Sequence, residues 1–173
     1  MRADGSSKFG ENNKYGYFPS VALGWNISKE YFLSESTIVN NLKLRASWGQ
    51  TGSQEGIDNK VSLASYIDSK SDNDTYPLDD SATTLDGYPF GTVPARTANP
   101  NLKWEVATQT NIGLDYGFLN NKITGTVDYF NKVTTDVVLF ANRVDPIQPT
   151  EKIWTNLEDL EIHNSGVEFA LDF

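Results

Sequence analysis

Apolar and polar residues alternate along five segments of the chain, and this period of two constrains the fold more than any other feature. The segments cover residues 17–27, 41–50, 102–118, 122–136 and 163–173. Successive side chains of a β-strand point to opposite faces of a sheet, so each segment predicts a strand with one apolar face. No segment has the periodicity of a long amphipathic helix. We therefore expect an all-β chain, an antiparallel meander of about five long strands.

The connections between the expected strands differ sharply in length. Only residues 119–121 separate the third strand from the fourth, as in a hairpin turn, whereas a long loop of about residues 51–101 separates the second from the third. Another sizeable loop covers about residues 137–162. If the strands alternate in direction, both long loops lie at one end of the sheet. This layout is typical of a transmembrane β-barrel with long extracellular loops, and loops of this length are uncommon in compact soluble domains.

The parity of each residue divides the strand side chains into an uncharged face and a charged face. The charged face supplies the candidate lumen-facing residues, which are Lys43, Arg45, Glu105, Asp115, Asp128 and Glu168. A charge facing lipid costs up to about 2–4 kcal/mol near the bilayer midplane, so a barrel wall requires this separation. A soluble β-sandwich also alternates, and a carbohydrate-binding or adhesion module of that class is the alternative interpretation.

Aromatic residues on the uncharged face fall near both ends of the expected strands. Trp48, Trp104 and Tyr129 lie at the long-loop end, and Trp25 and Tyr116 lie at the short-turn end. Amphipathic rings prefer the membrane–water interface, so these residues are candidates for two membrane girdles. From Trp104 to Tyr116 a strand runs roughly 40 Å, or about 28 Å of depth at a tilt of about 45°, close to the apolar band of about 25 Å in membrane barrels.

The composition excludes several kinds of site. The chain has no cysteine and a single histidine, His163, which rules out a thiol nucleophile and a two-histidine metal site. No acid–base pair or nucleophile motif predicts an enzyme. The net charge of -9 argues against a nucleic-acid partner. We expect no cofactor; calcium held by the acidic run of residues 68–80 is the alternative, although the run lacks the spacing of an EF-hand loop.

Four stretches, in order along the chain, resemble one known family. They are "RADGSSKFGENNKYGYFPSVALGWNISKEYFL" (residues 2–33), "VNNLKLRASWGQTGSQ" (39–54), "NPNLKWEVATQTNIGLDYGFLNNKITGTVDYFNKVTTDVV" (99–138) and "NSGVEFALDF" (164–173). They are similar to the C-terminal barrel of SusC/RagA-type TonB-dependent transporters of Bacteroidetes outer membranes. The resemblance implies a 22-stranded barrel with an N-terminal plug, which imports glycan or peptide fragments with energy relayed by TonB. A surface lipoprotein of the SusD type would close over the barrel as a lid.

Under this resemblance, residues 1–173 are a partial TonB-dependent receptor β-barrel domain without the plug. Five strands cannot close a barrel of 22 and would leave two bare edges, so we expect a piece of a larger outer-membrane transporter. The implied partners are a SusD-like lipoprotein, outer-membrane lipid, a glycan or peptide substrate, and TonB through the missing N-terminal region. Aromatic residues of the long loop are candidate contacts for substrate or lid, or could pack the loop on itself; they are Tyr66, Tyr76, Tyr88 and Phe90.

Overall fold

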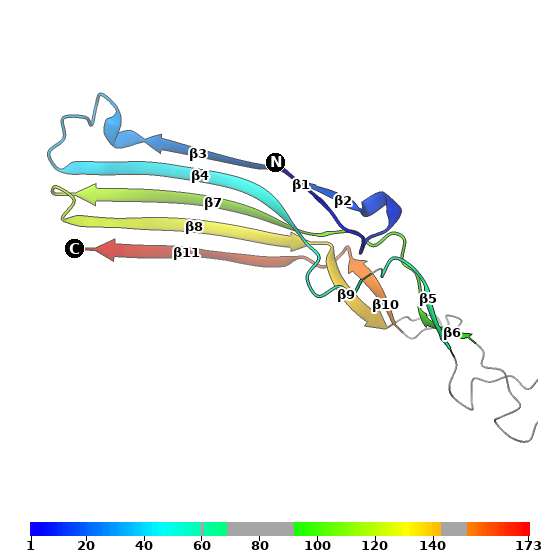
Figure 1. Ribbon diagram of the computed structural model, residues 1–173. Coiled ribbons are helices and arrows are strands. Elements are labelled where there is room, and N and C mark those ends of the chain that lie inside the picture. The colour runs from blue at the N-terminus through cyan, green and yellow to red at the C-terminus, as the bar shows by residue number, and fades with distance from the viewer. Residues whose placement is uncertain (60, 69–91, 143–151) are drawn as a thin grey trace, which may run out of the picture.

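Five antiparallel strands form one sheet in the spatial order β11–β8–β7–β4–β3 (Figure 1). The computed structural model describes residues 1–59, 61–68, 92–142 and 152–173. The strands of the sheet are β3 (Ser20–Asn26), β4 (Val39–Ser53), β7 (Glu105–Phe118), β8 (Ile123–Thr135) and β11 (Ile162–Asp172). The helical elements of the described residues are two 3₁₀ turns, η1 (Glu11–Asn13) and η2 (Ile27–Lys29), and no described helix could cross a membrane. The prediction of an all-β chain with about five long strands is confirmed.

The sheet is long, curved and open at both edges (Figure 1). β4, β7 and β8 contain 15, 14 and 13 residues, well above the roughly 5–6 residues of an ordinary strand. Within the described residues, β3 pairs only with β4 and β11 pairs only with β8, so the outer edge of each is unpaired. An open sheet with two bare edges is the arrangement expected of a partial barrel.

The first expected strand, residues 17–27, is divided by Pro19. Proline has no N–H to continue a ladder, and it separates β2 (Tyr15–Phe18) from β3. The carbonyl of Pro19 accepts the N–H of Gln50 at 2.9 Å, which keeps the chain attached to β4 at this break. β2 pairs with β1 (Arg2–Gly5) in a sheet of its own. Ile27, expected to end the strand, lies in η2 instead.

Both segments expected to be long loops contain short strands in their described parts. β5 (Ser65–Asp68) pairs with β6 (Thr92–Arg96), and β9 (Val137–Asn142) pairs with β10 (Lys152–Leu157). Asp136, with a left-handed φ of 55°, separates β8 from β9 and redirects the chain out of the main sheet. Figure 1 shows these hairpins at the end of the sheet that lies opposite the β7–β8 turn, so the long connections share one end as predicted.

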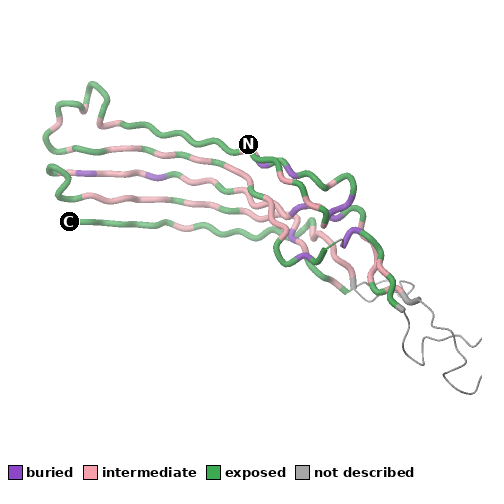
Figure 2. The backbone as a smooth tube through the Cα atoms, viewed as in Figure 1, coloured by how far each residue is buried: buried purple, intermediate pink, exposed green. Residues whose placement is uncertain are grey.

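A small hydrophobic cluster fills the junction between the main sheet and the short hairpins (Figure 2). Its buried members are Phe9, Phe18, Ile57, Val61, Leu102 and Trp104. Glycine at positions 16 and 52 makes room for the cluster, because a Cβ at either position would overlap the ring of Phe18. Away from this cluster, no described segment covers the main sheet. Most of the large apolar side chains of the sheet are half-buried or exposed.

Trp104 lies in this cluster and corrects one sequence-based prediction. Its ring centroid is 4.7 Å from that of Phe9 and 5.7 Å from that of Phe18, and its indole N–H donates to the carbonyl of Asn13 at 3.1 Å. The side chain is 7% exposed and precedes β7 rather than belonging to it. The prediction that Trp104 is an exposed girdle residue is therefore wrong.

The opposite end of the sheet is closed by the predicted hairpin turn between β7 and β8. Leu119, Asn120 and Asn121 all adopt left-handed φ angles of 55–58°. The N–H of Leu119 donates to the carbonyl of Ile38 at 2.9 Å, and the N–H of Asn120 donates to the side-chain oxygen of Asn40 at 2.6 Å. These bonds tie the turn to the start of β4.

Candidate functional site: the charged face of the sheet

The register of the strands places the large apolar side chains of the sheet, apart from Phe130, on one face. In the middle of that face, Trp25, Leu44, Leu114, Val127 and Phe169 form one row across the five strands. Leu23, Val167 and Phe169 are 73%, 69% and 66% exposed. Monomeric soluble proteins rarely expose apolar patches larger than a few hundred Å². This face therefore needs a cover that the described strands do not provide.

Three of the remaining girdle candidates, Trp25, Trp48 and Tyr129, are 50%, 37% and 45% exposed on this uncharged face. Tyr116 is half-buried there and stacks on Phe118 with ring centroids 5.6 Å apart. The indole N–H of Trp25 also donates to the carboxylate of Glu30 at 2.9 Å. That these side chains meet a membrane interface stays a prediction.

The opposite face carries an ion-pair cluster centred on Arg45. Its guanidinium donates to both carboxylate oxygens of Asp115, with the shortest distance 2.7 Å, and pairs with Asp128 on the next strand at 3.0 Å. Gly113 lies between Arg45 and Asp128 in the register. A Cβ at Gly113 would overlap both charged side chains, so the glycine lets Arg45 reach across β7.

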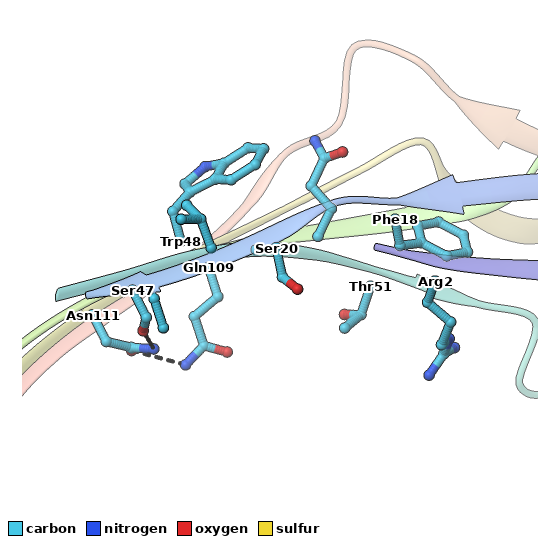
Figure 3. Close-up of a pocket in the computed structure, with 12 residues that line it drawn as sticks. Arg2, Phe18, Ser20, Ser47, Trp48, Thr51, Gln109 and Asn111 are labelled. Atoms are coloured by element: carbon cyan, nitrogen blue, oxygen red, sulfur yellow. Dashed lines mark hydrogen bonds between the residues drawn. The ribbon is translucent and has the colours of Figure 1, made fainter. Parts of the chain in front are cut away.

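On β4 and β7, polar but uncharged side chains occupy the next rows of this face, toward the long-loop end. The amide of Gln109 donates to the side-chain oxygen of Asn111 at 3.0 Å, and the amide of Asn111 donates to the hydroxyl of Ser47 at 3.2 Å. Figure 3 shows these three side chains on one side of the strands, with Trp48 on the other. A hollow of about 440 Å³ extends from them toward Ser20 and the edge of β3.

A second hollow, of about 360 Å³, shares this amide-rich wall and extends to β8 and β11. Its further lining includes Phe130, Lys132, Asn164 and Glu168. In the five-stranded sheet, all of which the structure describes, Phe130 is the only aromatic residue on the charged face. Phe130 was not among the predicted site residues, although it has the same parity as Asp128 and Lys132.

The structure places the predicted lumen-facing residues as follows. Lys43, Arg45, Asp115, Asp128 and Glu168 lie on the charged face, and Lys43 pairs with Asp115 in the register while Glu168 pairs with Asp128. Glu105 lies at the start of β7, where its carboxylate accepts the N–H of Val138 in β9 at 3.4 Å. That this face borders a lumen stays a prediction.

A separate polar cluster at the long-loop end joins the segment before β7 to β9 and β10. The side-chain amide of Asn156 accepts the N–H of Lys103 at 3.0 Å and donates to the carbonyls of Lys103 and Asp136, both at 2.9 Å. The ammonium of Lys103 lies 2.8 Å from Asp136 and 3.2 Å from Glu158. The hydrogen bond to Asp136, more than that to Glu158, raises the pKa of Lys103 above its ordinary value despite partial burial.

The long-loop predictions fall mostly outside the described residues. Tyr66, in β5, is 67% exposed; Tyr76, Tyr88 and Phe90 lie outside the described residues, as do residues 69–80 of the acidic run proposed for calcium. Among the residues that the structure does describe, no group of three acidic or histidine side chains is placed to hold a metal ion. His163 contacts Glu161 at 3.0 Å on the surface.

Comparison with known proteins gives matches along the whole chain. The family model described as "TonB dependent receptor-like, beta-barrel" matches residues 1–173. The TonB-dependent receptor SusC of Bacteroides thetaiotaomicron is 38% identical over 177 residues, which cover 99% of this chain and 16% of that protein. The TonB-dependent receptor P3 of Formosa agariphila is 34% identical over 172 residues, with the same coverage of 99% and 16%.

Solved structures also match over nearly the whole chain. The RagAB peptide importer in the closed-closed state aligns with a TM-score of 0.75 at 27% identity, covering 98% of this chain and 17% of that one. The same importer in the open-open state aligns with a TM-score of 0.76 at 27% identity, covering 95% and 16%. The chain thus spans 16% of the length of both sequence relatives.

Proposed function

This chain belongs to the TonB-dependent receptor-like β-barrel family, and we propose that it forms part of the wall of an outer-membrane importer of SusC/RagA type. The observation that carries the proposal is the exposed, uncharged face across strands of 11–15 residues, opposite a face that holds every strand charge. A transmembrane β-strand needs about 9–11 residues, which β4, β7, β8 and β11 provide. The uncharged face would contact lipid and the charged face would border the lumen.

Because Trp104 is buried and does not face outward, the apolar band is shorter than the one predicted from the sequence. The band now runs from the row of Trp48 and Thr110 to the row of Phe118 and Ile123. The eight steps from Thr110 to Phe118, at about 3.3 Å each and tilted by about 35–45°, give roughly 19–22 Å of depth, compared with about 25 Å in known membrane barrels. The band is therefore a few Å shorter than the one usual in outer-membrane barrels.

The proposed activity is active import of nutrient fragments, either oligosaccharides or peptides, without catalysis by this chain. Energy would come from TonB through a part of the protein outside these residues. The neighbours are described as RagAB peptide importers, in closed-closed and open-open states, which supports a gated importer. A SusD-like lipoprotein is the proposed lid, and it would meet the long-loop end, where the described residues form the β5–β6 and β9–β10 hairpins.

The alternative, a soluble β-sandwich, has less support. A sandwich covers the apolar face of one sheet with a second sheet about 10 Å away. The described strands place no second sheet over Leu23, Val167 or Phe169, which stay exposed.

A direct test uses the gene that encodes the complete protein containing this sequence. We expect the product to fractionate with outer membranes, to run as a heat-modifiable barrel in electrophoresis, and to be required for uptake of a nutrient oligosaccharide or peptide. Deletion of TonB should abolish uptake without removing the protein from the membrane. Recovery of the full-length product as a soluble monomer would overturn the proposal.

A further inference from the structure

Residues 99–104, which lead into β7, belong to no helix or strand, and side chains from two distant segments bind their backbone. Buried backbone groups outside a ladder need such partners, because an unpaired buried N–H or C=O costs about as much as a lost hydrogen bond. Leu102 and Trp104 are both buried, so the segment passes through the hydrophobic cluster. The two asparagines that bind it, Asn13 and Asn156, come from opposite ends of the chain.

Asn13 holds this segment from the side of the N-terminal hairpin β1–β2. It is the last residue of η1 and lies just before β2. Its side-chain amide donates to the carbonyls of Asn101 and Leu102 at 3.2 and 3.3 Å, and its backbone carbonyl accepts the indole N–H of Trp104 at 3.1 Å. Movement of the hairpin away from the segment would break all of these bonds.

Asn156 holds the same segment from the side of the hairpin β9–β10. Its side chain accepts the N–H of Lys103 and donates to the carbonyl of Lys103, and it also donates to the carbonyl of Asp136, just before β9. In the other direction, the side-chain amide of Asn99 donates to the carbonyl of Trp154 in β10 at 2.7 Å. The segment and the hairpin β9–β10 are therefore bonded to each other from both sides.

The two asparagines bind consecutive residues of the one segment. Asn13 binds the carbonyls of Asn101 and Leu102, and Asn156 binds the next residue, Lys103. Asparagine suits both positions because its amide can donate and accept, whereas a carboxylate would lose the donors and repel the carbonyls. A segment released by one asparagine can shift and lengthen its bonds to the other, and segments that share contacts in this way open as a cooperative unit.

We propose that residues 99–104 act as a clasp, through which Asn13 and Asn156 couple the β1–β2 and β9–β10 hairpins into one unit that opens together. The unit is attached to the wall of the sheet, because the clasp continues directly into β7. Both hairpins lie at the long-loop end (Figure 1). In the importer, and to this extent the inference rests on the proposed function, the clasp gives the entrance a rim that does not open hairpin by hairpin.

The first test follows hydrogen exchange in the wild-type full-length protein, purified in detergent, by mass spectrometry at increasing guanidinium concentrations below global unfolding. We expect peptides that cover β2 and β10 to lose their protection at the same concentration, because they belong to one cooperative unit. Loss of protection at clearly different concentrations would show that the hairpins open independently and would overturn the proposal.

The second test uses Asn156→Asp and Asn13→Asp, which preserve the size of the side chain but remove its N–H donors. Asn156→Asp should speed exchange about tenfold in β10 and by a similar factor in β2, because it leaves carbonyls of the clasp region unpaired. Asn13→Asp should have the reciprocal effect on β10. Faster exchange that stays confined to the substituted side would contradict the coupling.

Asn12→Asp is the matched control, because Asn12 is exposed and the substitution adds the same charge beside Asn13. It should leave the exchange of both hairpins unchanged, and an equal acceleration would overturn the role given to the hydrogen bonds of Asn13. Heat-modifiability shows whether each variant has folded, and the wild-type measurement decides the question without any variant. The proposed function fails separately, if the protein supports no uptake of any nutrient, a result that leaves the exchange of the purified protein unchanged.

Discussion

A single added charge can tell the two faces of the sheet apart. Val127 and Thr126 are adjacent in β8, so their side chains point to opposite faces. Val127 lies in the central row of the uncharged face, between Leu114 and Phe169, whereas Thr126 lies opposite Asp115 on the charged face. Lysine at these two positions adds the same charge to the same strand in opposite surroundings.

The lysine variants on the two faces should lower the free energy of unfolding by clearly different amounts. Val127→Lys should destabilise the full-length barrel by about 2–4 kcal/mol, because the ammonium would face hydrocarbon near the midplane. Thr126→Lys should change the stability by less than about 1 kcal/mol, since Asp115 is directly across the strand pair. Ile123→Lys, at the short-turn end of the same uncharged face, should cost only about 0–1 kcal/mol.

The assay is guanidinium unfolding of the full-length protein reconstituted in lipid vesicles, followed by tryptophan fluorescence. The order of destabilisation should be Val127→Lys first, with Ile123→Lys and Thr126→Lys both small. Equal destabilisation by Val127→Lys and Thr126→Lys would refute the assignment of the uncharged face to lipid. A larger cost at Ile123 than at Val127 would refute the placement of the membrane midplane.

Three further predictions concern the full-length protein. Gly113→Val should push Arg45 away from its carboxylate on β8 and lower the free energy of unfolding by about 1–3 kcal/mol, and an unchanged value would mean that the ion pairs rearrange freely. Trp104→Ala should cost about 3–5 kcal/mol locally and expose the long-loop end to added protease, whereas an exposed girdle residue would leave proteolysis unchanged. The hydrogen bond to Asp136 raises the pKa of Lys103, so its stabilising effect should persist below the ordinary value of 10.5 and disappear as the pH rises through the raised value. Protease resistance of the long-loop end should therefore fall at alkaline pH. Lys103→Met should remove this pH dependence, and an identical pH profile of protease resistance in the variant would contradict a stabilising role of charged Lys103.

Alternation predicted the strands well because a one-residue slip would move every side chain to the wrong face. The second, third and fourth expected strands correspond to β4, β7 and β8 with small differences at their ends. The errors fall where a local backbone feature interrupts the period. Pro19 divides the first strand, and the left-handed Asp136 separates β8 from β9, so residues beyond each break pair in other sheets.

The candidate site was harder to predict, because parity assigns a face but not a neighbour. Trp48 and Trp104 have the same parity, yet Trp48 is exposed and Trp104 is buried. Phe9 and Val61, which help to bury Trp104, lie far from it in sequence. Phe130 was not predicted for a related reason: only the register between β8 and β11 brings it beside Gly166.

The charged face combines paired and unpaired polar groups along its whole length. Toward the short turn, Arg45 holds both Asp115 and Asp128, whereas Lys43, in the row of Asp115, and Glu168, in the row of Asp128, form no ion pair with any described residue. Toward the long loops, amides replace the ion pairs, and Lys132 has no partner among the described residues. A transported molecule can compete only for groups that are not already paired, since displacing an existing pair would leave its members uncompensated. Unpaired charged groups such as Lys43, Lys132 and Glu168 are therefore the ones on this face that a ligand could bind without displacing an existing pair.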